Sequence, residues 1–194
     1  MNLESIERHL TSKASLSEAE RLHLRSIAQS GLSGPTDDAV ALLYGYPAET
    51  GVTVKDRQLL EHIVDNACST HTRALALGLL CNWLSLAKEE IGRILVAILD
   101  RTDSGDFLCI KACSCAAMAL REVSDPRLAR MLVDVFRDET RPEGTRRSVR
   151  SALLRLDGMV PRDIKAADIL DPDHLQKRAE AVAKRLTSAS GKSV

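Results

Sequence analysis

The sequence of 194 residues predicts an all-α fold. Only 3% of the residues are aromatic, whereas leucine, alanine and arginine, which favour helices, are abundant. Residue pairs typical of helix starts recur along the chain. A stripe of apolar residues also returns about every thirty-six positions, which predicts repeated helical units.

Capping residues mark the predicted helix boundaries. A side-chain acceptor before the first turn, followed by glutamate or proline, is typical of a helix start. The candidate starts are Ser17-x-x-Glu20, Asp125-Pro126, Thr140-x-x-Glu143 and Asp171-Pro172. Asp157-Gly158 is typical of a helix end. We predict helices over residues 2–12, 17–30, 36–46, 54–67, 70–86, 88–101, 106–123, 125–138, 143–157, 161–170 and 172–187, with the main loop over 47–53.

The repeat is clearest in alternate helices. Apolar or small residues spaced by three and four positions form one face of a helix. Leu77, Cys113 and Val149 are equivalent positions on three such faces, each about thirty-six residues after the last. The same offset relates Leu80, Ala116 and Ala152, and then Leu84, Leu120 and Leu156. Three helix pairs therefore share one pattern.

Composition and charge restrict the function. The chain has 27 basic residues (lysine and arginine) and 27 acidic residues (aspartate and glutamate), so its net charge is zero. No overall field therefore attracts nucleic acid or an anionic membrane. The first residues, MNLESIERHL, carry acids where a secretory signal needs positive charge, and no apolar run is long enough for a membrane span. We expect a cytoplasmic protein with reduced thiols.

Three of the five cysteines lie in the segment CIKACSCAAMAL. At about 100° per residue, Cys109 and Cys113 fall on the buried face of one helix, and Cys115 points towards a neighbouring helix. One rigid helix cannot direct these thiols to a single metal ion, so we interpret them as packing residues. Cys68 and His71, near His62, make a zinc site conceivable, but we favour a helix cap at Thr70 and two ordinary, partly buried side chains. We predict no cofactor, no metal and no catalytic constellation, and hence no enzyme.

The paired helices resemble HEAT repeats and their bacterial HEAT-like relatives. The resemblance rests on SDPRLARMLVDVFRD as a first helix and AAMALREVSDP closing the preceding second helix. It implies a right-handed α-α superhelix, or α-solenoid, of about four to five helix pairs. We expect one domain over residues 1–187 and a disordered tail over 188–194. Within that domain the best repeats cover 54–158, a degenerate cap covers 1–46 and capping helices cover 161–187.

Such an array offers a concave docking surface, and the second half of the chain supplies a basic one. A face of the helix over 143–157 turns arginines away from its apolar stripe, and the helix over 106–123 does the same with Lys111 and Met118. The predicted protein-binding residues are Lys111, Met118, Arg121, Arg146, Arg147, Arg150 and Leu154. Arginine pairs with carboxylates and exposed apolar residues anchor contacts, so we expect a protein partner with an acidic surface.

Other interpretations of the same residues stay open. The arginines could instead pair with Glu122, Asp134, Asp138 and Asp157 as a solvated ladder between repeats. The main function predicted is that of an adaptor, an inhibitor or a toxin-immunity protein. The alternative is a nucleic-acid-binding protein related to the HEAT-like alkylpurine DNA glycosylases, although the chain is neutral and places Trp83 in its most apolar helix. A tetrapyrrole-handling protein resembling phycobilin lyases would have to use Cys109 and Cys113.

Overall fold

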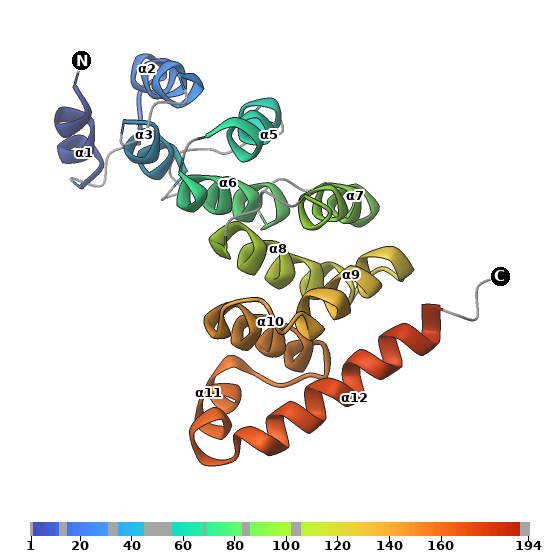
Figure 1. Cartoon of the computed structure of the whole chain (residues 1–194). Coiled ribbons are helices and arrows are strands. Elements are labelled where there is room, and N and C mark those ends of the chain that lie inside the picture. The colour runs from blue at the N-terminus through green and yellow to red at the C-terminus, as the bar shows by residue number, and fades with distance from the viewer. Residues whose placement is uncertain are drawn as a thin grey trace. The chain divides into compact units, whose positions relative to one another are not determined.

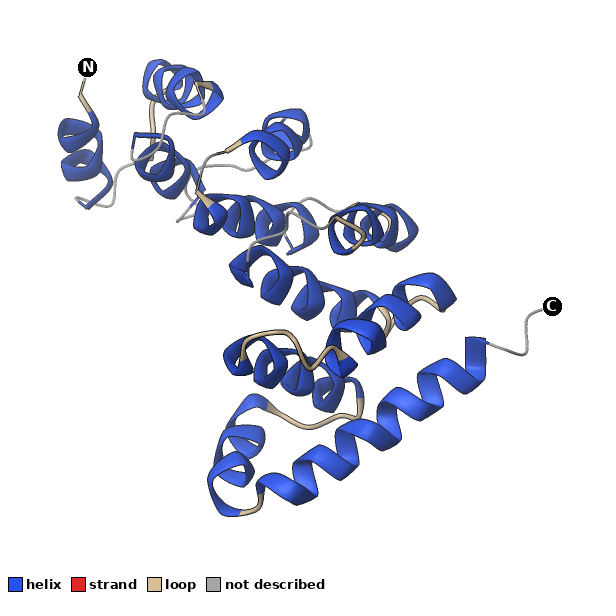
Figure 2. Cartoon of the chain, in the orientation of Figure 1, coloured by secondary structure: helices blue, strands red, loops and turns tan. Residues whose placement is uncertain are grey.

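The structure is a computed structural model that describes residues 2–11, 15–30, 35–44, 56–67, 69–82, 86–101 and 106–190. These residues form helices joined by short connections, and no strand occurs among them (Figure 2). The all-α prediction is therefore confirmed for this part of the chain. The helices are α1 Leu3–Thr11, α2 Glu18–Gln29, α3 Pro35–Tyr44, α5 Arg57–Asn66, α6 Thr70–Asn82, α7 Lys88–Leu99, α8 Asp106–Ala119, α9 Pro126–Arg137, α10 Glu143–Leu156, α11 Pro161–Leu170 and α12 Pro172–Ser190.

The predicted helix boundaries agree closely with these bounds. The largest difference inside the described ranges is in α8, which ends at Ala119 although the prediction extends it to 123. At the carboxyl end, α12 continues to Ser190 although the prediction ends it at 187, so residues 188–190 of the predicted disordered tail are helical. The predicted loop over 47–53 lies outside the described residues. The helices form two compact units, Met1–Leu86 and Ala87–Val194, which are described separately.

In the first unit, helices pack as pairs that stack on one another. Helix α2 pairs with α3 and α5 pairs with α6; α2 then packs on α5 and α3 on α6, and α1 contacts α3 (Figure 1). The core between them is made of fully buried leucine and isoleucine side chains, among them Leu24, Leu60, Ile63 and Leu77. Burying such side chains stabilises each by about 1.5–3 kcal/mol, so the stacking of pairs stabilises helices that are short on their own.

Polar contacts fix the helix starts of this unit. The predicted capping box is confirmed, since the Ser17 hydroxyl accepts from the Glu20 amide and the Glu20 carboxylate accepts from the Ser17 amide at 2.8 Å. The Ser17 hydroxyl also donates to the Glu20 carboxylate at 2.7 Å, and this bond together with the one from the Ser17 amide lowers the pKa of Glu20 to about 2. At the start of α6, Ser69 and not Thr70 is the cap, because the Ser69 hydroxyl accepts from the Thr72 amide.

Arg25 on α2 holds the segment before α5. Its Nε donates to Asp56 Oδ1 at 3.1 Å, and Asp56 is only 2% exposed. A buried carboxylate is costly unless a charge pairs with it, so this contact fixes how α5 begins relative to α2.

In the second unit, α7 pairs with α8 and α9 with α10. Helix α7 packs on α9, and α8 packs extensively on α10 (Figure 1). Helix α12 then lies along both α9 and α10, while the shorter α11 contacts α10 and α12. One apolar cluster joins α8, α9, α10, α11 and α12 and includes Cys113, Leu132, Leu153 and Leu175.

Six of the nine residues of the predicted thirty-six-residue stripe are buried in cores. Leu120 and Leu156 are partly buried against the core of the second unit, and Leu84 lies outside the described residues. Leu77, Cys113 and Val149 are each 0% exposed, and so are Leu80 and Ala116. Equivalent positions on α6, α8 and α10 are therefore buried alike, as the periodicity predicts. The single-domain assignment and the repeat count stay predictions.

The helix ends of the second unit follow the sequence signals with one exception. The Asp125 carboxylate accepts from the Arg127 and Leu128 amides at the start of α9, and Asp171 accepts from the His174 amide at 3.0 Å. Gly158 ends α10 with φ of 84°, a conformation that L side chains rarely adopt. The capping box predicted at Thr140 is wrong, because Pro142 precedes α10 and the Thr140 hydroxyl bonds to Asp138.

A close approach between α7 and the start of α9 depends on Gly92. A Cβ atom at that position would lie 2.8 Å from Asp125 Oδ2. Because the other oxygen of this carboxylate caps α9, the side chain cannot turn away without loss of the cap. Because Gly92 has no side chain, α7 can pack directly against the Asp125 carboxylate that caps α9.

Candidate functional site

The predicted binding face of α8 is on the surface. Met118 is 37% exposed, Arg121 is exposed and Lys111 is half-buried. Arg121 donates to the backbone carbonyl of Arg155, and Arg155 Nη1 reaches Ser114 Oγ at 3.4 Å. The outward orientation of this face is confirmed, and part of its charge ties α8 to α10.

The predicted exposure of Leu154 on α10 is wrong. Leu154 is 0% exposed and belongs to the same apolar cluster as Ile164 of α11 and Leu175 of α12. The chain turns back after α10, with the Met159 amide donating to the Leu154 carbonyl at 3.1 Å, and α11 packs on α10. Helix α11, which follows in the sequence, thus covers the face of α10 that carries Leu154. The apolar pattern of α10 alone predicts that this face is exposed.

The same helix neutralises two of the predicted arginines. Arg150 pairs with Asp168 of α11 and its side chain is only 16% exposed. Arg147 lies 3.5 Å from the same carboxylate and 3.2 Å from Glu143. For Arg147 and Arg150 the structure favours the ion-pair interpretation.

The acids that form these pairs differ from the predicted ones, apart from Asp138. Asp138 pairs with Arg141 at 3.0 Å. Asp157 instead binds Arg178 and Arg185 of α12. The hydrogen bonds from Arg185 and Arg178 lower the pKa of the Asp157 carboxyl. Asp157 therefore fastens α12 to the end of α10.

Arg146 lies in a different place, in a groove between α12 and the α9–α10 corner. Two adjoining hollows of about 660 Å³ and about 110 Å³ form it, and both are lined by Phe136, Arg146 and Gln176. We call it the arginine groove. The larger hollow adds Arg137, Glu139, Glu180 and Lys184, and the smaller adds Glu143, Arg147 and Arg150.

The charges of the arginine groove are incompletely balanced. Among the described residues, Arg137, Arg146 and Lys184 take part in no ion pair. The Arg146 Nε is buried and has no hydrogen-bond partner in the same part of the chain. Glu180 accepts from Gln176 at 3.0 Å. The groove therefore contains cations that no acidic side chain of the described residues neutralises.

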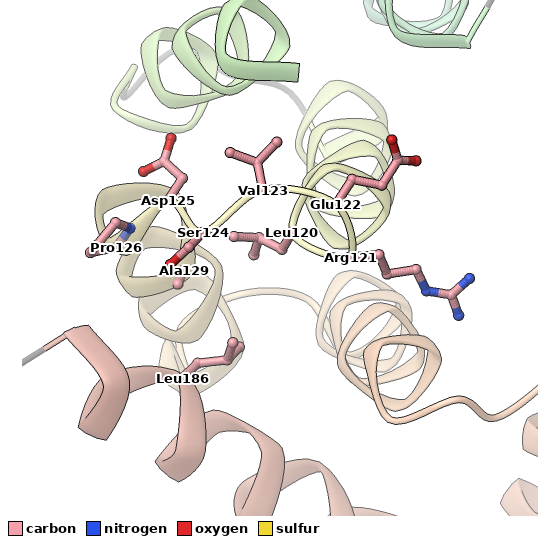
Figure 3. Close-up of a pocket in the computed structure, with 9 residues that line it drawn as sticks. All are labelled: Leu120, Arg121, Glu122, Val123, Ser124, Asp125, Pro126, Ala129 and Leu186. Carbon is pink, nitrogen blue, oxygen red and sulfur yellow. The ribbon is translucent and has the colours of Figure 1, made fainter. Parts of the chain in front are cut away.

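A third hollow, of about 240 Å³, lies beside the α8–α9 turn (Figure 3). Leu120 and Leu186 supply its apolar lining, while Arg121 extends away from them. Of its two acidic side chains, Asp125 points towards α7 and caps α9, and Glu122 lies 3.5 Å from Lys88. The polar groups here already serve the fold, so we place the candidate site in the arginine groove.

The cysteines occupy the positions that the helical pattern predicts. Cys109, Cys113 and Cys115 are at most 2% exposed. A hydrogen bond with Cys109 and burial raise the pKa of the Cys113 thiol well above its usual range. No group of at least three histidine, cysteine or acidic side chains that could hold a metal occurs among the residues that were placed.

Both histidines of the possible zinc site, His62 and His71, are exposed. Cys68 and Trp83 lie outside the described residues. None of the helices within the described ranges is both long and apolar enough to span a bilayer.

Comparison of the chain with protein-family models, with curated proteins and with solved structures finds no match. The candidate site therefore rests on the geometry of the second unit.

Sequence reasoning missed part of this groove. Phe136, Arg137, Gln176 and Lys184 were not among the predicted site residues, although Gln176, Glu180 and Lys184 form a polar stripe at spacings of four along one helix. That stripe was a signal for a shared polar surface. Only the packing of α12 on α9 brings it opposite Phe136 and Arg137.

Proposed function

We propose that this chain is a non-catalytic, HEAT-like repeat protein that binds another protein through the basic surface of its second unit. The stacking of helix pairs within each unit supports a superhelical repeat architecture. The burial of equivalent residues at Leu77, Cys113 and Val149 supports a common repeat. Under this proposal the chain acts in the cytoplasm as an adaptor, an inhibitor or an immunity protein.

The observation that carries the proposal is the arginine groove. It contains cations, Arg146 among them, that form no ion pair with other described residues. Phe136, whose exposed fraction is 8%, lines the same groove. Arginine with available donors and a neighbouring apolar surface is a common composition of protein interfaces. On α8, Met118 and Arg121 extend the same chemistry over the surface of the unit.

The proposal is tested by identifying a partner and reconstituting the complex. The tagged chain is isolated from its own cells, the co-purifying proteins are identified by mass spectrometry, and each candidate is purified separately and titrated into the chain by calorimetry. We expect one candidate to bind and to protect amides of α8, α10 or α12 in hydrogen exchange.

A different result would support the nucleic-acid alternative. If no purified candidate binds, and the chain instead binds duplex DNA with an affinity that falls steeply as salt rises, the protein-binding proposal is wrong. Each neutralised phosphate contributes about 0.9 to the slope of log affinity against log salt, so this outcome is easily recognised.

A further inference from the structure

We infer that the arginine groove holds an extended acidic segment of the partner protein, with carboxylates placed on Arg146 and on the cations beside it. This inference rests on the proposed function and narrows it, because it names the form and the charge of the bound element. It also restricts the contact to residues other than Arg147 and Arg150, which already pair with Glu143 and Asp168.

The dimensions of the groove favour an extended chain. Gln176, Glu180 and Lys184 line it along one side of α12, and their eight-residue separation corresponds to about 12 Å of helix. An extended peptide advances about 3.3 Å per residue, so roughly three to four residues fit along this wall. Successive side chains of such a peptide point to opposite sides, which brings every second side chain to the groove.

The charges of the groove favour protein over nucleic acid. The lining of the larger hollow contains acids as well as cations, since Glu139 and Glu180 line it together with Arg137, Arg146 and Lys184. A phosphodiester backbone is negative at every step and would meet these acids. A peptide can place a carboxylate opposite each cation and an uncharged residue opposite each acid, so it avoids the repulsion.

Arg146 is the expected centre of recognition. Its side chain is half-buried, it lines both hollows together with Phe136, and its Nε lacks a partner within the described structure. A guanidinium can donate two parallel hydrogen bonds to one carboxylate, and partial burial strengthens such a bond. Arg137 and Lys184 are exposed and would bind neighbouring carboxylates more weakly.

The test uses the full chain and a defined probe. A fluorescein-labelled peptide in which glutamate alternates with serine is titrated with the chain and followed by fluorescence anisotropy. The control peptide carries glutamine in place of each glutamate. We expect the acidic peptide to bind and to weaken as salt rises, and the control peptide to bind at least about tenfold more weakly.

Variants then locate the binding. Arg146→Gln should raise the Kd at least about tenfold, and the double variant Arg137→Gln with Lys184→Gln should raise it several-fold. The double variant changes only exposed side chains, so it tests the groove even if Arg146→Gln unfolds the unit. Arg130→Gln, an exposed arginine on α9 that does not line the groove, is the matched control and should bind as the wild-type chain does.

The outcomes separate the groove from the wider proposal. If the acidic peptide fails to bind, or binds every variant equally, the groove inference is wrong. If a purified partner protein still binds those variants unchanged, the groove inference fails while the proposed function stands. Binding of duplex DNA that is lost in the groove variants, without any protein partner, would overturn both.

Discussion

Replacement of Asp157 by asparagine should loosen α12 and do so in a pH-dependent way. The Asp157 side chain is 19% exposed and its Oδ2 lies 2.6 Å from Arg178 Nε, and Arg185 binds the other oxygen. The two arginines are 39% and 66% exposed, so solvent screens both pairs. Exposed pairs stabilise by about 0–1 kcal/mol each, and more buried charge-assisted hydrogen bonds by about 1.5–3 kcal/mol. We expect a loss of about 1–2 kcal/mol in the free energy of unfolding near neutral pH.

The sign of the pH dependence follows from the direction of the shift. The pKa of Asp157 in the folded chain lies below its ordinary value of 3.8. Its ion pairs therefore stabilise the fold fully at pH values above that value, and this stabilisation is lost as the pH falls through the lower folded pKa. Urea unfolding of the wild-type chain and of Asp157→Asn should be compared between pH 7 and pH 3. The difference in their free energy of unfolding should be constant near neutral pH and should shrink towards pH 3.

Asp134→Asn is the matched control for this experiment, because Asp134 is exposed on α9 and forms no ion pair with the other described residues. It should leave the unfolding free energy nearly unchanged. A difference between the wild-type chain and Asp157→Asn that stays constant down to pH 3, or one no larger than that of the control, would refute the reasoning.

Three further experiments test the fold by denaturant unfolding. Ser17→Ala removes the capping box of α2 and should cost about 1 kcal/mol; no loss would contradict that cap. In the wild-type chain, Gly92→Ala should add little stability or reduce it. In a chain that also carries Asp125→Ala, which removes the obstructing carboxylate, the same substitution should stabilise by about 0.5–1 kcal/mol. Equal effects in both backgrounds would exclude the clash. Leu154→Ala should cost about 2–5 kcal/mol and Met118→Ala under about 0.5 kcal/mol, and the reverse order would contradict their burial.

Local signals in the sequence were sufficient to predict the helices. Asp125 before Pro126 and the box at Ser17 act within a single turn, so their effect is visible without knowledge of the fold. The placement of Cys113 on a buried face is likewise a property of one helix and its period.

Non-local packing decided what the sequence could not show. Leu154 is buried because α11 and α12 pack on α10, and nothing in the pattern of α10 says which later helix covers it. The arginine groove has the same origin, since Phe136 and Gln176 are forty residues apart and meet only because α12 lies along α9. Hydrophobic periodicity shows the main apolar face of a helix, but not which further faces later helices will cover.

Helix α12 carries two features at once, one wall of the arginine groove and the arginines that bind Asp157. A ligand held against Gln176 and Lys184 would bind only while this helix is docked, so occupancy and docking are thermodynamically linked. Partner binding should therefore slow the local opening of α12. Acidification that protonates Asp157 and breaks its ion pairs with α12 should lower the affinity for the partner, even though no residue of the groove has changed.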